Sequence, residues 1–242
     1  MAEHAKEAGH WNDREGNPRY TIIGKNGKER PTTLRDAKKE KLLPSVTSII
    51  RCAAAPGLER WKSAQVLMAA LTTDRLPNES EQEYIDRIIK DSQEQAMKAR
   101  ERGTQIHAWV QGGFEGEKIP EEAYVYYLSA INTIDPQRDI PWECEQSFAA
   151  ERYGGKIDLQ SEDYIIDIKT TDKDLTDVKT WHEHHMQLAA YSQNNGHKCG
   201  ILYINYKAET KLIWITEEEK NIGWKCFNAL LDYFYAKTGL GG

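Results

Sequence analysis

The sequence predicts an α/β protein in which a mixed central β-sheet is flanked by helices and preceded by an N-terminal helical region. Residues 42–135 carry apolar side chains at helical spacing, whereas residues 142–170 have the pattern of three consecutive strands. The rest of the chain continues with a helix, two further strands and a closing helix. This order of elements is typical of a mixed sheet with helices on its faces.

Composition limits the kind of protein. The chain has 242 residues, 39% hydrophobic and 29% charged, which suits a folded, soluble domain and excludes a disordered chain. No apolar run approaches the roughly 20 residues that cross a bilayer, and the polar N-terminus lacks the apolar core of a secretory signal. The four cysteines form no C-x-x-C pair, which argues against a zinc ribbon or a disulfide framework. We therefore expect a cytoplasmic protein without a membrane partner; the oligomeric state is left open.

Charge is unevenly distributed along the chain. The net charge is −6, yet residues 19–41 hold eight basic and three acidic side chains, a local charge of +5 that leaves −11 elsewhere. A solvated flexible segment and a phosphate-contacting arm both fit this pattern. We expect residues 1–41 to form a basic, partly flexible segment. Residues 42–242 would then form a single domain, with a helical part (42–135) and an α/β core (136–242).

Local signals place the individual elements. Pro44 and Ser45 precede an apolar stretch, as at a helix start, and Ser80 and Glu83 are spaced as a capping box. Gly103 is expected to mark a break or a close contact inside a long helix. We expect helices at 44–50, 58–72, 78–112, 121–134, 181–195 and 217–237. We expect strands at 20–24, 142–150, 155–160, 164–170, 198–205 and 211–216.

The stretch from residue 153 to 171 carries the candidate chemistry. Side chains alternate along a strand, so Asp167 and Lys169 share one face, and a tight turn brings Asp158 beside Asp167. Two close carboxylates repel each other unless a cation or a proton lies between them. Oxygen ligands of this kind suit Mg²⁺ or Mn²⁺, and a neighbouring lysine can orient water or stabilise charge on phosphorus. These residues predict a metal-dependent phosphodiester hydrolase.

Simpler explanations remain open for each residue taken alone. A D-x-K sequence in a strand with one solvated face is ordinary, and a lone helical histidine such as His107 is usually structural, although imidazole is a common metal ligand. Gln187 and Tyr191 lie four residues apart on one helix face, an ordinary spacing. Glu145 offers a further carboxylate, for which an exposed strand residue is the simpler account.

Taken together and in order, these motifs resemble a known family. His107, G-x-x-D (Gly155–Asp158), D-x-K-T (Asp167–Thr170) and Q-x-x-x-Y (Gln187–Tyr191) resemble the RecB-like branch of the PD-(D/E)XK nuclease superfamily. The segments LPSVTSII, GLERW and GTQIHAWVQGGFEGE are similar to the mitochondrial genome maintenance exonuclease and its phage and bacterial relatives. The resemblance runs from about Leu42 to Tyr191.

The resemblance implies a restriction-endonuclease-like core and a role for each matching residue. The implied metal ligands are His107, Asp158, Asp167 and the backbone carbonyl of Ile168. Lys169 would position the attacking water, while Gln187 and Tyr191 would order the site and the DNA strand. Some members also hold an iron–sulfur cluster on four cysteines, but the cysteine spacing here differs, so we expect none.

The expected function is a Mg²⁺- or Mn²⁺-dependent DNA exonuclease that acts on ends, on single strands, in bacterial or phage replication, recombination or repair. Lys98, Arg100 and Arg102 would contact phosphates along a helical wall or arch that guides a free end. A structure-specific endonuclease and a non-catalytic DNA-binding module remain as alternatives. The histidines from His182 onward do not complete H-E-x-x-H, because Met186 stands at the last position, and no phosphate-binding P-loop occurs.

Overall fold

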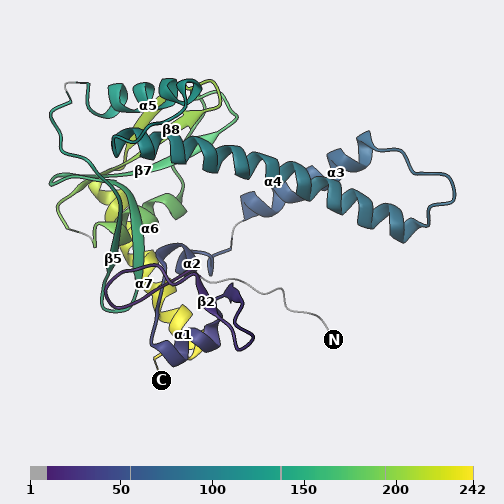
Figure 1. Ribbon diagram of the computed structural model, residues 1–242, viewed down its shortest axis with the longest axis horizontal. Coiled ribbons are helices and arrows are strands. Elements are labelled where there is room, and N and C mark those ends of the chain that lie inside the picture. The colour runs from purple at the N-terminus through teal and green to yellow at the C-terminus, as the bar shows by residue number, and fades with distance from the viewer. Residues whose placement is uncertain (1–9, 55, 137, 194, 242) are drawn as a thin grey trace. The chain divides into compact units, whose positions relative to one another are not determined.

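The computed structural model describes residues 10–54, 56–136, 138–193 and 195–241, without the side chains at 56, 95, 96 and 99. The chain divides into two compact units (Figure 1). The first unit contains the chain up to Ala53 and from Trp109 onward, and the second is Ala54–Ala108. This division differs from the expected basic segment at 1–41 followed by a single domain at 42–242.

The first unit is built on a five-stranded sheet in the order β5-β6-β7-β8-β9. β7 and β8 are parallel, whereas the other three neighbouring pairs are antiparallel, so the sheet is mixed as predicted. The strands are β5 (Glu143–Ala149), β6 (Gly154–Gln160), β7 (Tyr164–Thr171), β8 (Lys198–Asn205) and β9 (Thr210–Trp214).

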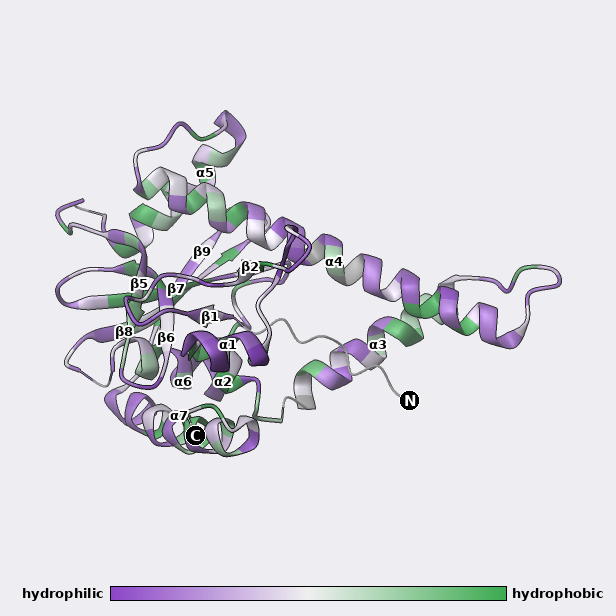
Figure 2. Cartoon of the chain, turned by 60° about the horizontal axis from the view of Figure 1, so that its bottom comes forward, coloured by the Kyte–Doolittle hydropathy of each residue, from purple (hydrophilic) through white to green (hydrophobic). Residues whose placement is uncertain are grey.

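Helices cover both faces of this sheet. Figures 1 and 2 show α5 (Glu121–Ile134) on one side, and α6 (His182–Tyr191) and α7 (Glu217–Thr238) on the other. On the α5 side, the Tyr126 hydroxyl donates to the Tyr206 carbonyl at 2.8 Å. The prediction of an α/β fold with a mixed sheet flanked by helices is confirmed.

The neighbouring strands β7 and β8 carry buried apolar side chains on both faces, because helices cover both sides of the sheet. Asp167, only 2% exposed, is the buried charged residue of β7. Its burial among isoleucines marks it as a residue that needs a specific partner. The most buried apolar residues of β7 and β8 are Ile165, Ile166, Ile168, Ile201, Leu202 and Ile204.

The basic N-terminal segment contains more structure than the sequence indicated. Beyond residue 9 it holds β1 (Trp11–Asn12), a hairpin of β2 (Thr21–Ile23) and β3 (Glu29–Pro31), and α1 (Leu34–Glu40). Trp11 and Ala37 are buried, 3% and 0% exposed, in the core of the first unit. The strand predicted at 20–24 corresponds to β2, whereas β1, β3 and α1 were not predicted. The burial of Trp11 and Ala37 depends on contacts with distant parts of the chain. The next elements are β4 (Leu43–Pro44), which pairs with β1, and α2 (Val46–Ile50).

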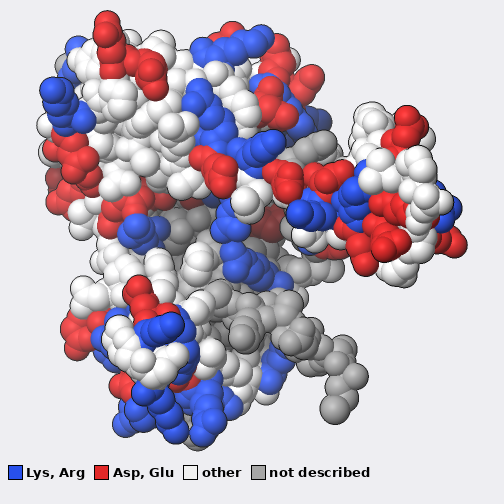
Figure 3. Space-filling model, turned by 45° about the vertical axis from the view of Figure 1, so that its right-hand side comes forward, with Lys and Arg blue, Asp and Glu red and all other residues white. Residues whose placement is uncertain are grey.

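Part of the positive charge in this segment is paired internally. Arg30 donates to both carboxylate oxygens of Asp36, at 2.6 and 2.9 Å, and Lys39 pairs with Glu40. Figure 3 shows lysine and arginine side chains gathered at the bottom of the molecule, where Figure 1 places α1 and the end of α7. The phosphate-contacting role of the segment stays a prediction.

The second unit is a pair of helices, α3 (Pro56–Thr72) and the larger part of α4 (Glu81–Phe114). The Tyr84 hydroxyl joins them by donating to the carbonyls of Ala70 and Thr73, at 3.1 and 2.9 Å. The predicted capping box of Ser80 and Glu83 is present, and α4 continues through Gly103 without a break. Several large apolar side chains of α3 are exposed: Leu58, Trp61, Val66, Leu67, Met68 and Leu71.

None of the helices in the described residues combines the length and the apolar character that crossing a membrane requires.

Candidate metal centre

The sheet opens beside Asp158. The paired register of β6 and β7 consists of Leu159↔Ile166 and Gln160↔Ile165 and does not continue to Asp158. Instead, the Asp158 carboxylate accepts a hydrogen bond from the Ile168 N–H at 2.7 Å. A side-chain oxygen thus takes a donor that a continued ladder would have used. Asp158 is thereby held against the backbone between Asp167 and Lys169.

The same contact says where the Ile168 carbonyl points. In a strand, the N–H and C=O of one residue face the same side, as the paired bonds of an antiparallel ladder require. Because the Ile168 N–H faces Asp158, its carbonyl faces the β6 side as well. This orientation is compatible with the metal-ligand role that the family resemblance implies for the Ile168 carbonyl.

Lys169 provides the counter-charge for the buried Asp167. Its Nζ lies 2.8 Å from Asp167 Oδ2. Burial opposes the charged form of Lys169, but the carboxylates of Asp167 and Asp158 outweigh it and raise the lysine pKa above its usual value. A buried carboxylate is strongly destabilising without such a partner. Lys169 is therefore a firmly protonated cation.

Gln187 connects this ion pair to α6. Its Nε2 donates to Asp167 Oδ1 and to the Tyr191 hydroxyl oxygen, both at 2.8 Å, and its Oε1 accepts from Lys169 Nζ at 3.2 Å. Burial and the carboxylates of Asp167 and Asp158 raise the pKa of Tyr191 well above its usual value, so the phenol stays neutral. The structure thus brings Asp167, Lys169, Gln187 and Tyr191 into one network.

Glu145 lies beside Asp158 on the neighbouring strand. The pairs Cys144↔Leu159 and Gln146↔Ile157 place Glu145 directly opposite Asp158. The backbone at Glu145 has φ 50°, in the left-handed region, which costs a non-glycine residue on the order of 1–2 kcal/mol. The expectation of an exposed strand residue is wrong, because the Glu145 side chain is only 16% exposed.

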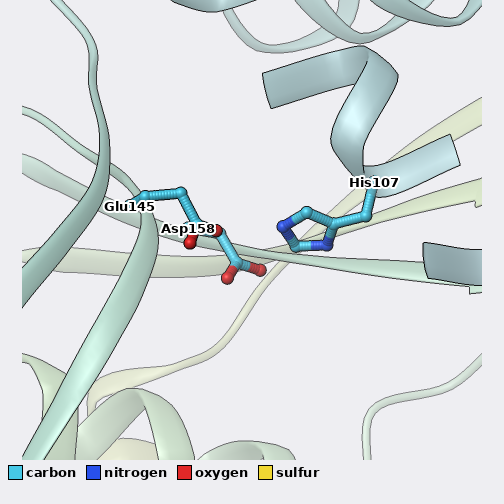
Figure 4. Close-up of side chains that lie close together, drawn as sticks. All are labelled: His107, Glu145 and Asp158. Carbon is cyan, nitrogen blue, oxygen red and sulfur yellow. The ribbon is translucent and has the colours of Figure 1, made fainter. Parts of the chain in front are cut away.

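Three side chains from three elements form a candidate metal centre. The possible ligand atoms of His107, Glu145 and Asp158 all lie within 4.8 Å of one another (Figure 4). His107 belongs to the last turns of α4, two residues before Trp109, where the first unit resumes. One imidazole and two carboxylates are suitable ligands for a divalent cation such as Mn²⁺ or Mg²⁺.

The structure therefore brings together part of the predicted ligand set and changes one member. His107 and Asp158 belong to the group together with Glu145, which was not among the predicted ligands, and the group does not include Asp167. Asp167 is engaged by Lys169 and Gln187 instead. The alternation of side chains along a strand was not sufficient to identify Glu145 as a candidate metal ligand. Its pairing with Asp158 depends on the register across the 150–153 turn, which the sequence does not determine.

His184 and Tyr203, which were not singled out as site residues, lie next to Lys169. Tyr203 pairs with Lys169 across β7 and β8. The His184 Nδ1 accepts the Trp181 N–H at 3.3 Å, so the ring proton of the neutral form sits on Nε2. Burial, together with the Lys169 charge, lowers the pKa of His184 to about 4. A neutral imidazole therefore lies near Lys169 at physiological pH.

The predicted phosphate-contacting residues all lie on α4 in the second unit. Lys98 and Arg100 are exposed, and Arg102 donates to Gln105 Oε1 at 2.9 Å. Exposure suits a phosphate contact but is also ordinary for a helix surface. Their role in binding DNA stays a prediction.

Comparisons with known proteins give little further information. No protein-family model matches the chain, and no curated protein matches it. Among solved structures, the chain is similar to SSO0001, known from a crystal structure. The alignment covers 72% of this chain and 86% of SSO0001, with 15% identity and a TM-score of 0.32. This distant likeness does not assign the chain to a family.

Proposed function

We propose that this chain is a Mg²⁺- or Mn²⁺-dependent deoxyribonuclease that hydrolyses phosphodiester bonds at the ends of single-stranded DNA. The observation that carries the proposal is the double role of Asp158. Its carboxylate belongs to the three-residue ligand group and is also hydrogen-bonded to the backbone between Asp167 and Lys169. A candidate metal centre and a protonated lysine therefore adjoin, as phosphodiester hydrolysis requires.

The donor set fits a hard divalent cation. His107, Glu145 and Asp158 would hold the ion, with the Ile168 carbonyl as a further oxygen ligand. When bound, such an ion lowers the pKa of a coordinated water and offsets the negative charge of a phosphate. The strained backbone of Glu145 supports this assignment, because strain of this kind tends to persist where a site depends on it.

Lys169 is suited to an electrostatic role. Its raised pKa keeps it protonated, which favours orienting water and stabilising charge on the phosphate over acting as a general base. Asp167 and Gln187 fix the position of its ammonium group. Because Gln187 is itself bonded to Tyr191, the lysine is held from α6 as well as from the sheet.

The DNA substrate and the preference for ends rest on the family resemblance and on the exposed basic residues of α4. Contacts from Lys98, Arg100 and Arg102 to phosphates would position a strand without reading its sequence. The proposed setting is the cytoplasm, in replication, recombination or repair. Lys98→Ala and Arg100→Ala would each weaken binding of unrelated sequences equally, whereas Lys90→Ala, on an exposed site of the same helix, serves as the matched control.

Digestion of labelled linear single strands and covalently closed circles of the same sequence tests the proposal. We expect linear strands to be degraded in Mg²⁺ or Mn²⁺, with circles intact and no digestion in excess EDTA. Cutting of circles would favour the endonuclease alternative. Binding without cleavage in either metal would favour the non-catalytic DNA-binding module. Full activity in EDTA would exclude the metal-dependent mechanism.

A further inference from the structure

A second lysine adjoins the candidate metal centre. Lys156 precedes Asp158 by two residues on β6, so both side chains point to the same side of the strand. The Lys156 ammonium forms an ion pair with the carboxylate of Glu145. One of the three candidate ligands is therefore already paired with a positive charge supplied by the chain itself.

Lys156 and Lys169 are held in different ways. Lys169 pairs with a carboxylate that is 3% exposed and is also bonded to Gln187. Lys156 is 38% exposed, on a flexible stem, and its partner is a candidate metal ligand. Half-exposed ion pairs are weak, and a lysine ammonium moves readily on its four-carbon chain. A divalent cation that bound Glu145 would compete directly with Lys156.

We propose that Lys156 is a DNA-binding residue whose ammonium group neutralises Glu145 in the metal-free protein and turns to a DNA phosphate once a divalent cation occupies the centre. This inference rests on the proposed function. The phosphate that approaches the metal would lie beside β6, within reach of a lysine that already contacts a ligand of that metal. The positive charge is kept in both states and only its partner changes.

The exchange predicts two effects of opposite sign for Lys156→Met, which keeps the unbranched stem of the side chain and removes its ammonium group. Without DNA, Mn²⁺ should bind about three- to fivefold more tightly, because the competing ammonium is gone. DNA should bind about fivefold more weakly, with a salt dependence shallower by about 0.7, the value of one single-strand phosphate contact. A lysine with a purely structural role would not move the two affinities in opposite directions.

Calorimetry with Mn²⁺ alone, and fluorescence anisotropy of a labelled single-stranded oligonucleotide in Ca²⁺ over a series of salt concentrations, measure the two effects. We expect Ca²⁺ to support DNA binding with little turnover, because it tolerates loose, long coordination. Lys225→Met, at an exposed site on α7, is the control for the change in net charge, and Lys156→Arg should retain DNA affinity. Thermal unfolding establishes that each variant is folded.

The outcomes separate this inference from the proposed function. If the wild type binds Mn²⁺ and Asp158→Asn does not, the centre is a metal site. Unchanged or weaker Mn²⁺ binding by Lys156→Met would then overturn the exchange alone, as would DNA binding equal to that of Lys225→Met. If the wild type binds no Mn²⁺, both proposals fail together.

Discussion

Glu145 stands directly opposite Asp158 across β5 and β6, with a backbone φ of 50° that interrupts an otherwise regular ladder. The ladder resumes on both sides without a shift in register, since Cys144 and Gln146 keep their regular partners. The distortion is thus confined to the one residue whose carboxylate lies beside Asp158. The regular pairs on both sides hold Glu145 in a strained backbone conformation that a regular strand would not require.

Replacing Glu145 by glycine separates the backbone strain from the carboxylate. Glycine adopts positive φ without steric cost, so Glu145→Gly should keep a free energy of unfolding within about 1 kcal/mol of the wild type. Loss of a ligand should weaken Mn²⁺ binding by at least about tenfold, measured by calorimetry. Glu145→Gln, which keeps the shape of the side chain, is the matched variant. Equal Mn²⁺ affinity in all three proteins would remove Glu145 from the centre.

Two substitutions of Asp158 divide its structural role from its chemical role. Asp158→Asn keeps an oxygen that can accept from the Ile168 N–H, so we expect a stable protein whose cleavage rate falls by orders of magnitude. Asp158→Ala should be equally inactive and also less stable by about 1–3 kcal/mol, because a backbone donor loses its partner. Denaturant unfolding and single-turnover digestion measure these effects. Near-normal cleavage by Asp158→Asn would contradict the site.

Asp167 and Lys169 are expected to behave as a unit. Lys169→Met should abolish cleavage and leave the Asp167 carboxylate buried without its cation, so its free energy of unfolding should fall by about 3 kcal/mol. Combining it with Asp167→Asn should recover much of this stability without recovering activity. A double variant that is no more stable than Lys169→Met would show that the ion pair is not what the buried carboxylate requires.

His107→Ala should raise the Mg²⁺ concentration needed for half-maximal activity more than it weakens DNA binding, because the imidazole belongs to the ligand group. Digestion over a range of Mg²⁺ concentrations and anisotropy in Ca²⁺ measure the two effects separately. If His107→Ala is destabilised but its remaining activity needs the same Mg²⁺ concentration as the wild type, His107 is a core residue only.

The neutral His184 predicts a pH dependence of stability. Its pKa is about 4 in the folded chain and about 6.5 when unfolded, so the unfolded state binds more protons between these values. The free energy of unfolding should therefore fall as the pH falls from 6.5 to 4, by up to about 3 kcal/mol from this group. His184→Asn keeps an acceptor near Nδ1 and should lose this part of the dependence. Parallel curves of stability against pH for the two proteins would contradict the assignment.

Local patterns in the sequence were sufficient for most of the sheet and for half of the site. The alternating strands and the short turn at 161–163 placed β6 and β7, and with them Asp158 beside the Asp167–Lys169 strand. The four-residue spacing of Gln187 and Tyr191 likewise predicted a shared helix face, which the hydrogen bond between them confirms. These features depend on neighbours in sequence, which is why they could be predicted.

The features that escaped prediction depend on distant contacts. Trp11 is buried although the residues around it are polar, because its environment is supplied by α7 through Phe234. Glu145 became a candidate ligand only through the register of two strands and an unusual φ. Neither property is encoded in the spacing of nearby residues, so a single sequence could not reveal it.

α7 packs closely on α6 and so affects the position of Gln187, although α7 contributes no side chain to the candidate metal centre. A Cβ atom at Gly223 would lie 2.4 Å from the His185 carbonyl oxygen, so the two helices are as near as their backbones allow. Any larger residue there must push α6 aside, and Gln187, half a turn beyond His185, would move with it. The distance between Gln187 and Lys169 is thus set in part by the absence of a side chain at Gly223, which follows α6 after two intervening strands. The position of α7 therefore helps to determine where Gln187 of α6 holds the Lys169 ammonium group.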